Sequence, residues 1–296
     1  MHRLKSLLQI SSLLVASAFA QTSSPDGVME KIALVSPTDL KTWSAAECTA
    51  TPSGERARIG PSSWHWHVDV DHLAGEPKYP IGWPRISHTI TDGPLRDWSG
   101  WEFLHMWIFV ATSREALPGE PAGLGLLTPD RASGYNRPLR ELKKDQWIEL
   151  NIPVAQIPRH GDVRQIQFHV AEANYRHGDR LDFFINDLAL TRYAEPVLFD
   201  LVAENAVVFS DTMRLPVRFQ MLGLKPGAHA SVGCELRRDG QTAARVSVDA
   251  TAGAQRVVLD LGGKKLAPGN YELRASMADG GRVASTNLRV VESPWR

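Results

Sequence analysis

The sequence lacks several features that common classes of protein function require. Its 296 residues include 33 basic and 33 acidic side chains, so there is no basic excess of the kind that binds nucleic acid. The only two cysteines, Cys48 and Cys234, lie far apart, which argues against a disulfide-stapled scaffold and favours small buried thiols. The motifs Gly-x-Ser-x-Gly and His-Glu-x-x-His and the phosphate loop are missing. The enzyme classes that carry these signatures are therefore excluded.

Long apolar segments are also missing, with one exception at the N-terminus. Residues 7–19 form a short apolar run after a basic start, and the run ends in Ala18-Phe19-Ala20, with small residues where a signal peptidase reads. The run is shorter than the roughly 20 residues that span a bilayer, and no cysteine follows to carry a lipid anchor. The pattern predicts a signal peptide over residues 1–20, cleaved after Ala20. We expect a secreted or periplasmic protein without a membrane span.

Tryptophan is absent from residues 197–292, whereas eight of the nine tryptophans lie before residue 150. A shift in composition this sharp indicates two separate hydrophobic cores. The length that remains after cleavage is enough for two domains. We predict a first domain over residues 29–194 and a second over residues 197–292.

Long amphipathic helices are missing as well, and the first half alternates with a period of two. In residues 63–71, Trp64 and Trp66 point one way while His65 and His67 point the other. Further strands are expected at residues 103–111, 124–128, 146–152, 165–171 and 181–192. Many strands separated by turn residues predict an all-β fold, with an N-terminal jelly-roll β-sandwich.

The second half is predicted to form an immunoglobulin- or fibronectin-III-like β-sandwich. Its strands are expected at residues 215–222, 230–237, 244–248, 256–261, 270–278 and 283–291. Asp239-Gly240 is typical of a hairpin turn. Residues 266–271 resemble the corner of immunoglobulin-like sandwiches, in which a tyrosine hydroxyl, here that of Tyr271, bonds back to the chain upstream. No residue of this half indicates chemistry, and we interpret it as a spacer or packing module.

Four stretches of the first half resemble the jelly-roll carbohydrate-binding modules of the galactose-binding-domain-like superfamily. They are residues 98–110 (WSGWEFLHMWIFV), 145–153 (DQWIELNIP), 163–168 (VRQIQF) and 182–190 (DFFINDLAL). Their order and spacing match, and together they cover most of the half. The resemblance implies a jelly-roll fold that binds a poly- or oligosaccharide, and we expect no required cofactor. Because such folds carry many functions, it does not identify the ligand.

The resemblance also implies a possible metal. In that family an acidic pair in the closing strand often helps to hold a structural calcium. Here the pair is Asn186 and Asp187, and an amide oxygen can still coordinate calcium. The alternative is that Asp187 only pins the edge of the sandwich.

Alternation within three strands predicts one outward polar face that binds the sugar. Trp107 is the expected platform, because aromatic rings stack on the C–H face of a pyranose while imidazoles and amides meet its hydroxyls. Tyr135, Asn136 and Arg137 are expected to close one end. The predicted ligand-binding residues are His65, His67, His105, Trp107, Tyr135, Asn136, Arg137, Gln167 and His169.

Other interpretations of the same residues stay open. His65-x-His67, with His105 or His169 opposite, is typical of zinc or copper sites in β-folds. The face could instead grip a protein partner in the cell envelope, which would make this a structural β-sandwich protein.

Catalysis is a third interpretation. Gln167 and His169, with Arg137, Arg140 and Tyr175, resemble the set that jelly-roll polysaccharide lyases use. Pro138, however, is unsuited to a central strand, and the paired glutamates of sandwich glycosidases are missing. We expect a non-catalytic glycan-binding protein or accessory module, with a lyase or glycosidase remnant as the alternative.

Overall fold

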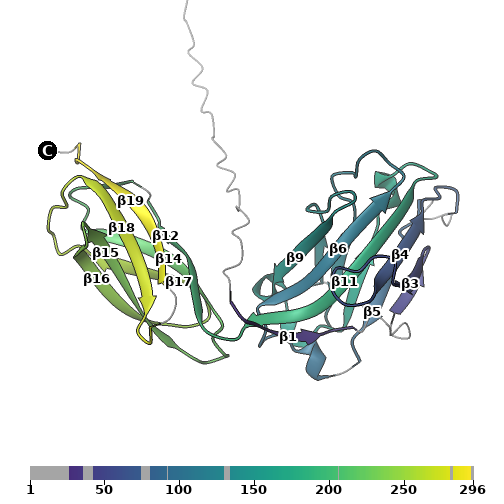
Figure 1. Ribbon diagram of the computed structural model, residues 1–296, viewed down its shortest axis with the longest axis horizontal. Coiled ribbons are helices and arrows are strands. Elements are labelled where there is room, and N and C mark those ends of the chain that lie inside the picture. Colours follow the sequence, from purple (N-terminus) through teal and green to yellow (C-terminus); the bar gives the residue numbers. More distant parts are fainter. Residues whose placement is uncertain are drawn as a thin grey trace, which may run out of the picture.

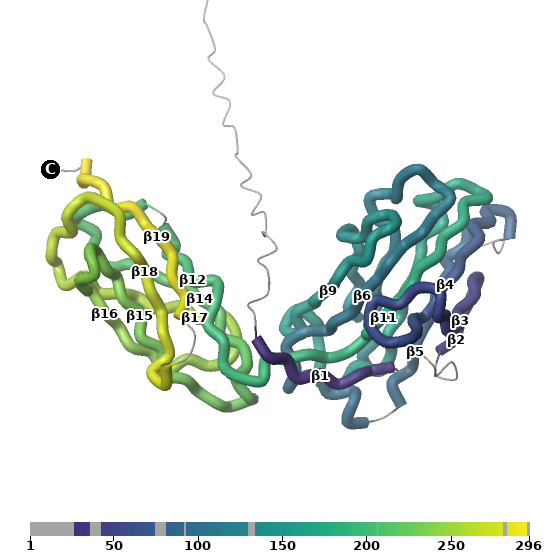
Figure 2. Tube along the Cα trace, viewed as in Figure 1, coloured from purple at the N-terminus to yellow at the C-terminus, as the bar shows by residue number. Residues whose placement is uncertain are grey.

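The computed structural model describes residues 27–35, 43–74, 81–91, 93–129, 134–205, 207–280 and 283–294. The predicted signal peptide lies outside these residues. Over the described ranges the chain forms strands joined by turns and single-turn 3₁₀ helices, without any α-helix, which confirms the all-β fold class. No helix there is long and apolar enough to cross a membrane. Figures 1 and 2 show two separate sets of strands, β1–β11 and β12–β19.

The first set forms a sandwich of two antiparallel sheets. Sheet I has the order β3-β4-β11-β6-β9, and β1 also pairs with β11. Its strands are β1 (Met29–Ala33), β3 (Thr49–Ser53), β4 (Ser63–Asp69), β6 (Phe103–Thr112), β9 (Trp147–Pro153) and β11 (Arg180–Tyr193). Sheet II has the order β2-β5-β10-β7-β8. Its strands are β2 (Trp43–Ala46), β5 (Arg85–Thr89), β7 (Gly123–Leu127), β8 (Tyr135–Pro138) and β10 (Gln165–His169).

Short 3₁₀ helices connect some of these strands. They are Pro94–Arg96, Val154–Gln156, His160–Asp162 and Glu172–Asn174. Each is one turn long, so they link strands without adding a layer to the sandwich.

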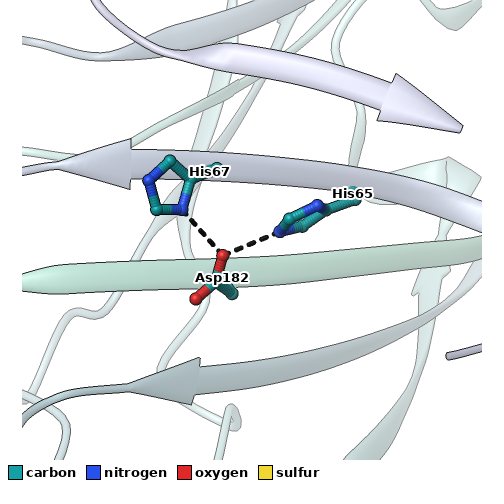
Figure 3. Close-up of side chains that lie close together, drawn as sticks. All are labelled: His65, His67 and Asp182. Atoms are coloured by element: carbon teal, nitrogen blue, oxygen red, sulfur yellow. Dashed lines mark hydrogen bonds and ion pairs between the residues drawn. The ribbon is translucent and has the colours of Figure 1, made fainter. Parts of the chain in front are cut away.

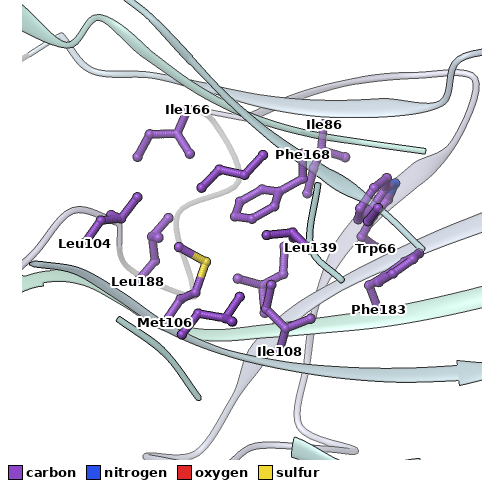
Figure 4. Close-up of a cluster of buried hydrophobic side chains, with 14 of the residues drawn as sticks. Trp66, Ile86, Leu104, Met106, Ile108, Leu139, Ile166, Phe168, Phe183 and Leu188 are labelled. Carbon is purple, nitrogen blue, oxygen red and sulfur yellow. The ribbon is translucent and has the colours of Figure 1, made fainter. Parts of the chain in front are cut away.

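The inward side chains of the two sheets meet in one core (Figure 4). Trp66 of sheet I is 1% exposed and stacks on Phe183 with ring centroids 4.5 Å apart. Phe168 and Ile86 of sheet II are fully buried. Each such side chain stabilises the fold by about 1.5–3 kcal/mol relative to leaving it exposed. The predicted alternation of β4, β6 and β10 is therefore confirmed on the inner side.

Strand β11 contains one extra residue between its two halves. Asn186 lies opposite Trp107 and Ala189 opposite His105, so three steps along β11 match two along β6. This is a β-bulge, and Asp187 within it has a positive φ of 55°. The bulge places Asn186 and Asp187 together on the outer face of sheet I.

The second set forms a sandwich with its own core, drawn from residues between Leu198 and Val290. Sheet III has the order β12-β14-β17 and sheet IV the order β13-β19-β18-β15-β16. The strands are β12 (Val197–Ala203), β13 (Val207–Phe209), β14 (Arg214–Leu222), β15 (Ala230–Arg238), β16 (Gln241–Ala250), β17 (Gly253–Asp260), β18 (Gly269–Met277) and β19 (Val283–Val291). Only the β13–β19 pair is parallel among these described strands.

Two local predictions for this half are confirmed. The Tyr271 hydroxyl donates to the Ala267 carbonyl at 3.1 Å, as the corner resemblance implies. Asp239 and Gly240 have φ of 49° and 78°, and two positive values suit a tight hairpin between β15 and β16.

Cys234 is a buried free thiol, and burial raises its pKa to about 11.

Candidate binding site

The nine predicted ligand-binding residues do not share one face. His65 and His67 lie on β4, and His105 and Trp107 on β6, all in sheet I. Gln167, His169 and Asn136 belong to sheet II. Because the inner faces of the two sheets meet across the core, their outer faces point in opposite directions. The single-face prediction is wrong, since alternation separates inside from outside but does not assign a strand to a sheet.

Tyr135 and Arg137 do not join Asn136 either. They lie opposite Leu126 and Leu124, whose side chains point into the core. Tyr135 packs against that core and Arg137 pairs with Glu141. The prediction that all three close one end of a site is therefore wrong for Tyr135 and Arg137, because successive side chains of a strand alternate.

The outer face of sheet II is compact around His169. This ring lies directly over Gly123, where a Cβ would be 2.3 Å from Nε2 of the ring. Trp83, which is 43% exposed, packs against the same ring with ring centroids 4.8 Å apart. Next to it, Gln167 donates to the Ser87 hydroxyl at 3.0 Å. Burial lowers the pKa of His169, because the surroundings disfavour the charged imidazolium.

The outer face of sheet I carries a cavity of about 560 Å³ between β1, β6, β9 and β11. Residues that line it include Lys31, Phe103, His105, Asn151, Asp187 and Thr191. The register explains their convergence, because His105 lies opposite Asn151 and Lys31 lies opposite Thr191. Of this group, the sequence predicted His105 as a ligand-binding residue and Asp187 as a possible calcium ligand, but not the other four.

Hydrogen bonds and ion pairs connect the polar residues of the cavity. The Lys31 ammonium lies 2.8 Å from Oδ1 of Asp187, and Nε2 of His105 lies 3.2 Å from Oδ2. Nδ1 of His105 lies 2.8 Å from Oδ1 of Asn151. Burial opposes the charge on His105, but the bonds to Asp187 and Asn151 outweigh it and raise its pKa. Burial likewise opposes the charge on Asp187, while its bonds to His105 and Lys31 lower its pKa overall.

Thr191 supplies an unusual group to this cavity. It is 5% exposed, and its hydroxyl is buried without a hydrogen-bond partner in the described part of the chain. A buried polar group left unpaired costs about 1–3 kcal/mol. Rotation of the Thr191 side chain would be needed to present this hydroxyl to a ligand, and a ligand hydroxyl that then bonded to it would recover part of that free energy.

Trp107 is not an open platform. The Arg58 guanidinium lies 4.8 Å from the centre of its ring, and Arg56 covers Phe109 at 4.5 Å. Both arginines belong to the segment between β3 and β4. Asn186 holds that segment, accepting from the Ile59 N–H at 2.7 Å and donating to the Ile59 and Ser62 carbonyls at 3.1 and 2.8 Å. The predicted stacking role is thus corrected, because an arginine occupies a ring face.

The predicted calcium does not fit the residues present. Calcium takes six to eight oxygen ligands, but the amide oxygen of Asn186 is used by Ile59. Both carboxylate oxygens of Asp187 face cationic side chains. Asp187 instead ties β1 to β11 through Lys31.

A second cluster lies further along sheet I, where Figure 3 shows His65, His67 and Asp182 pointing toward one another. Both imidazoles approach Oδ1 of Asp182 at 2.7 Å. The sequence pattern found the two histidines but not Asp182, which lies opposite His67 in the β4–β11 register. Assigning the two strands as neighbours would have revealed it.

The residues that resemble a polysaccharide-lyase site do not come together in one site. The Tyr175 hydroxyl is buried and donates to the Pro121 carbonyl at 2.7 Å, and burial raises its pKa. Arg137 and Arg140 each pair with a glutamate. None of these three side chains lies free to neutralise a uronate beside Gln167.

No protein-family model and no curated protein matches the chain. Solved structures with some similarity include an exo-beta-agarase (6% identity, 54% of this chain and 24% of that one, TM-score 0.35). A glycoside hydrolase domain of Endo-D from Streptococcus pneumoniae R6 is 11% identical over 84% and 36% (TM-score 0.27). A b-glucuronidase from Ruminococcus gnavus is 9% identical over 87% and 47% (TM-score 0.26). The chain spans less than half of each of these proteins, and likenesses this weak carry no argument about function.

Proposed function

We propose that this protein is an exported, non-catalytic carbohydrate-binding protein, and that the cavity on the outer face of sheet I holds the sugar. In this proposal the first sandwich is a galactose-binding-like module over residues 29–194. The second sandwich, over residues 197–292, is an immunoglobulin-like spacer. The observation that supports the proposal is the cavity itself, which combines an aromatic ring, an ordered polar network and an unpaired hydroxyl.

The size and lining of the cavity suit one or two sugar rings. Its volume of about 560 Å³ lies within the range of about 300–1,000 Å³ typical of small-molecule sites. Phe103 offers an apolar surface to the C–H face of a pyranose. Asn151 and Thr191 offer an amide and a hydroxyl to its hydroxyl groups.

The charges favour a neutral sugar. Lys31 is the cation of the cavity, His105 becomes a second cation when it is protonated, and Asp187 and Glu149 are the anions. The carboxylate of Asp187 already holds both cations. Since no cation remains unpaired in the lining, a uronate or sulfate group would find no free partner there.

The test is affinity electrophoresis and glycan-array binding with the full chain lacking its predicted signal peptide. Asn151→Ala and Phe103→Ala should each weaken binding to the best neutral glycan at least tenfold. Thr191→Val, which keeps the shape and removes the hydroxyl, should weaken it about tenfold, as the loss of one buried hydrogen bond predicts. Gln167→Ala on sheet II is the matched control and should leave binding unchanged.

Two results would replace this proposal. Binding that is lost in Gln167→Ala but kept in a folded Asn151→Ala variant would move the site to sheet II. Release of unsaturated ends from an acidic polysaccharide would make the protein a lyase.

A further inference from the structure

We propose that His65, His67 and Asp182 form a binding site for one divalent transition-metal ion of the zinc type. The site lies on the outer face of sheet I, and its residues are not among those that line the cavity. It stands independently of the carbohydrate proposal. A failure of either proposal leaves the other intact.

Strand pairing places the three side chains together. His65 and His67 are two residues apart on β4, so they point the same way. Asp182 of β11 lies directly opposite His67. Nε2 of His65, Nδ1 of His67 and a carboxylate oxygen of Asp182 all lie within 4.8 Å of one another. Three potential ligands thus converge from two neighbouring strands of a rigid sheet.

The spacing needs only a small adjustment to hold a metal. Each imidazole nitrogen lies 2.7 Å from Oδ1 of Asp182. Zinc binds nitrogen and oxygen at about 2.0–2.2 Å, which puts neighbouring ligands of a tetrahedral site about 3.3–3.5 Å apart. The carboxylate and the rings must therefore separate by less than about 1 Å. Rotation about their side-chain bonds achieves this without moving the strands.

Neighbouring groups orient both imidazoles. Nε2 of His67 lies 3.1 Å from the Asp69 carboxylate, which places the ring proton on Nε2 and leaves Nδ1 as the metal ligand. Carboxylate partners of this kind are typical of metal-binding histidines. The ring of His65 stacks on Phe184 with centroids 4.6 Å apart and an interplanar angle of 5°. Phe184 is itself buried, so it fixes the plane of His65.

The fourth position of the metal would be open to water. The side chains of His65, His67 and Asp182 are 25%, 29% and 33% exposed, so the ion would be reached from solvent. Two imidazoles and one carboxylate favour zinc, copper or nickel over calcium or magnesium, which prefer oxygen alone.

In a second pair of neighbouring histidines, one nitrogen of each ring is engaged by a backbone group. His72 and His177 lie with ring centroids 6.1 Å apart, beside Asp71. Their nitrogens, however, meet backbone groups, since Nε2 of His72 lies 3.1 Å from the Glu172 carbonyl and Nδ1 of His177 accepts from the His72 N–H. Proximity of two histidines is thus not sufficient, and this pair provides a control of matched composition.

The experiment is zinc titration by calorimetry, with metal content measured after chelation and reloading. It uses the full chain without its predicted signal peptide and without a histidine tag. We expect one zinc ion per chain. His65→Ala, His67→Gln and Asp182→Asn should each lower the affinity at least tenfold, and the His72→Ala/His177→Ala variant should stay within twofold of the parent chain.

Cobalt substitution provides a second measurement for the same variants. Co²⁺ in the parent chain should give visible d–d bands that are absent in His67→Gln, with far-ultraviolet circular dichroism confirming that the variant is folded. Absence of stoichiometric zinc in the parent chain would overturn the proposal. So would unchanged zinc affinity in a folded His67→Gln variant, or loss of zinc only in the His72→Ala/His177→Ala variant.

Discussion

Each outer face of the first sandwich carries a histidine whose pKa is shifted, and the two shifts have opposite directions. On sheet I, His105 lies between Asp187 and Asn151, and these bonds outweigh burial and raise its pKa. On sheet II, His169 contacts Gly123 and Trp83, and burial lowers its pKa. Its Nδ1 is buried without a partner in the described part of the chain. The difference shows that cross-strand neighbours, more than residue type, decide whether a β-sheet face carries charge.

The largest loss of stability is expected when the segment between β3 and β4, which covers part of the outer face of sheet I, loses its hydrogen bonds. Asn186→Ala removes three hydrogen bonds to the segment that carries Arg56 and Arg58. Because each of these three partly buried hydrogen bonds contributes about 0.5–1.5 kcal/mol, the free energy of unfolding should fall by about 3 kcal/mol. Urea denaturation followed by tryptophan fluorescence measures this. The exposed Asn136→Ala on sheet II is the control and should change stability by less than about 0.5 kcal/mol.

A smaller loss of stability is expected from a substitution on the outer face of sheet II. Gly123→Ala introduces a Cβ that would lie 2.3 Å from Nε2 of His169, and Trp83 also packs against that ring. We expect a loss of about 2 kcal/mol in thermal or urea denaturation. Gly125→Ala, where the nearest atom is 3.8 Å away, should cost clearly less. If the double variant Gly123→Ala/His169→Ala were as unstable as the single one, the ring would not be the cause.

The smallest effect is a pH dependence of opposite sign on the two faces. The pKa of His105 is raised above its ordinary 6.5, so its contribution to stability is complete below pH 6.5 and is lost as pH rises through the folded-state pKa. The pKa of His169 is lowered, so the unfolded state takes up its proton first and stability falls as pH drops below 6.5.

The measurement is the free energy of unfolding between pH 5 and 9 for the parent chain, His105→Gln and His169→Gln. The difference between the parent and His105→Gln should shrink with rising pH, and the difference for His169→Gln should grow. Parallel curves for both variants would contradict the contrast between the two faces.

Much of the fold could be predicted from the sequence because alternation is a local property. The inward rows of β4, β6 and β10 follow from it, and the Tyr271 corner follows from a motif that is equally local. Short strands escaped prediction where few residues alternate, as in β2 and β8, which are four residues long.

The site could be predicted only in part, because it depends on which strands are neighbours. Asp182 and Asn151 are visible in the sequence, yet nothing local indicates that they lie opposite His67 and His105. The same limit explains why β10 was assigned to the wrong face. Its partners are β5 and β7, so its outward residues belong to sheet II.

The bulge in β11 makes chain length, as well as composition, critical in that strand. Before it, Phe183 and Ile185 point into the core, and after it Leu188 and Leu190 do so. Deleting one residue of the bulge would restore regular alternation and keep these leucines inward, whereas inserting one would turn the second half of the strand inside out and send the leucines to solvent. We therefore expect this stretch to tolerate the loss of the extra residue better than the gain of another.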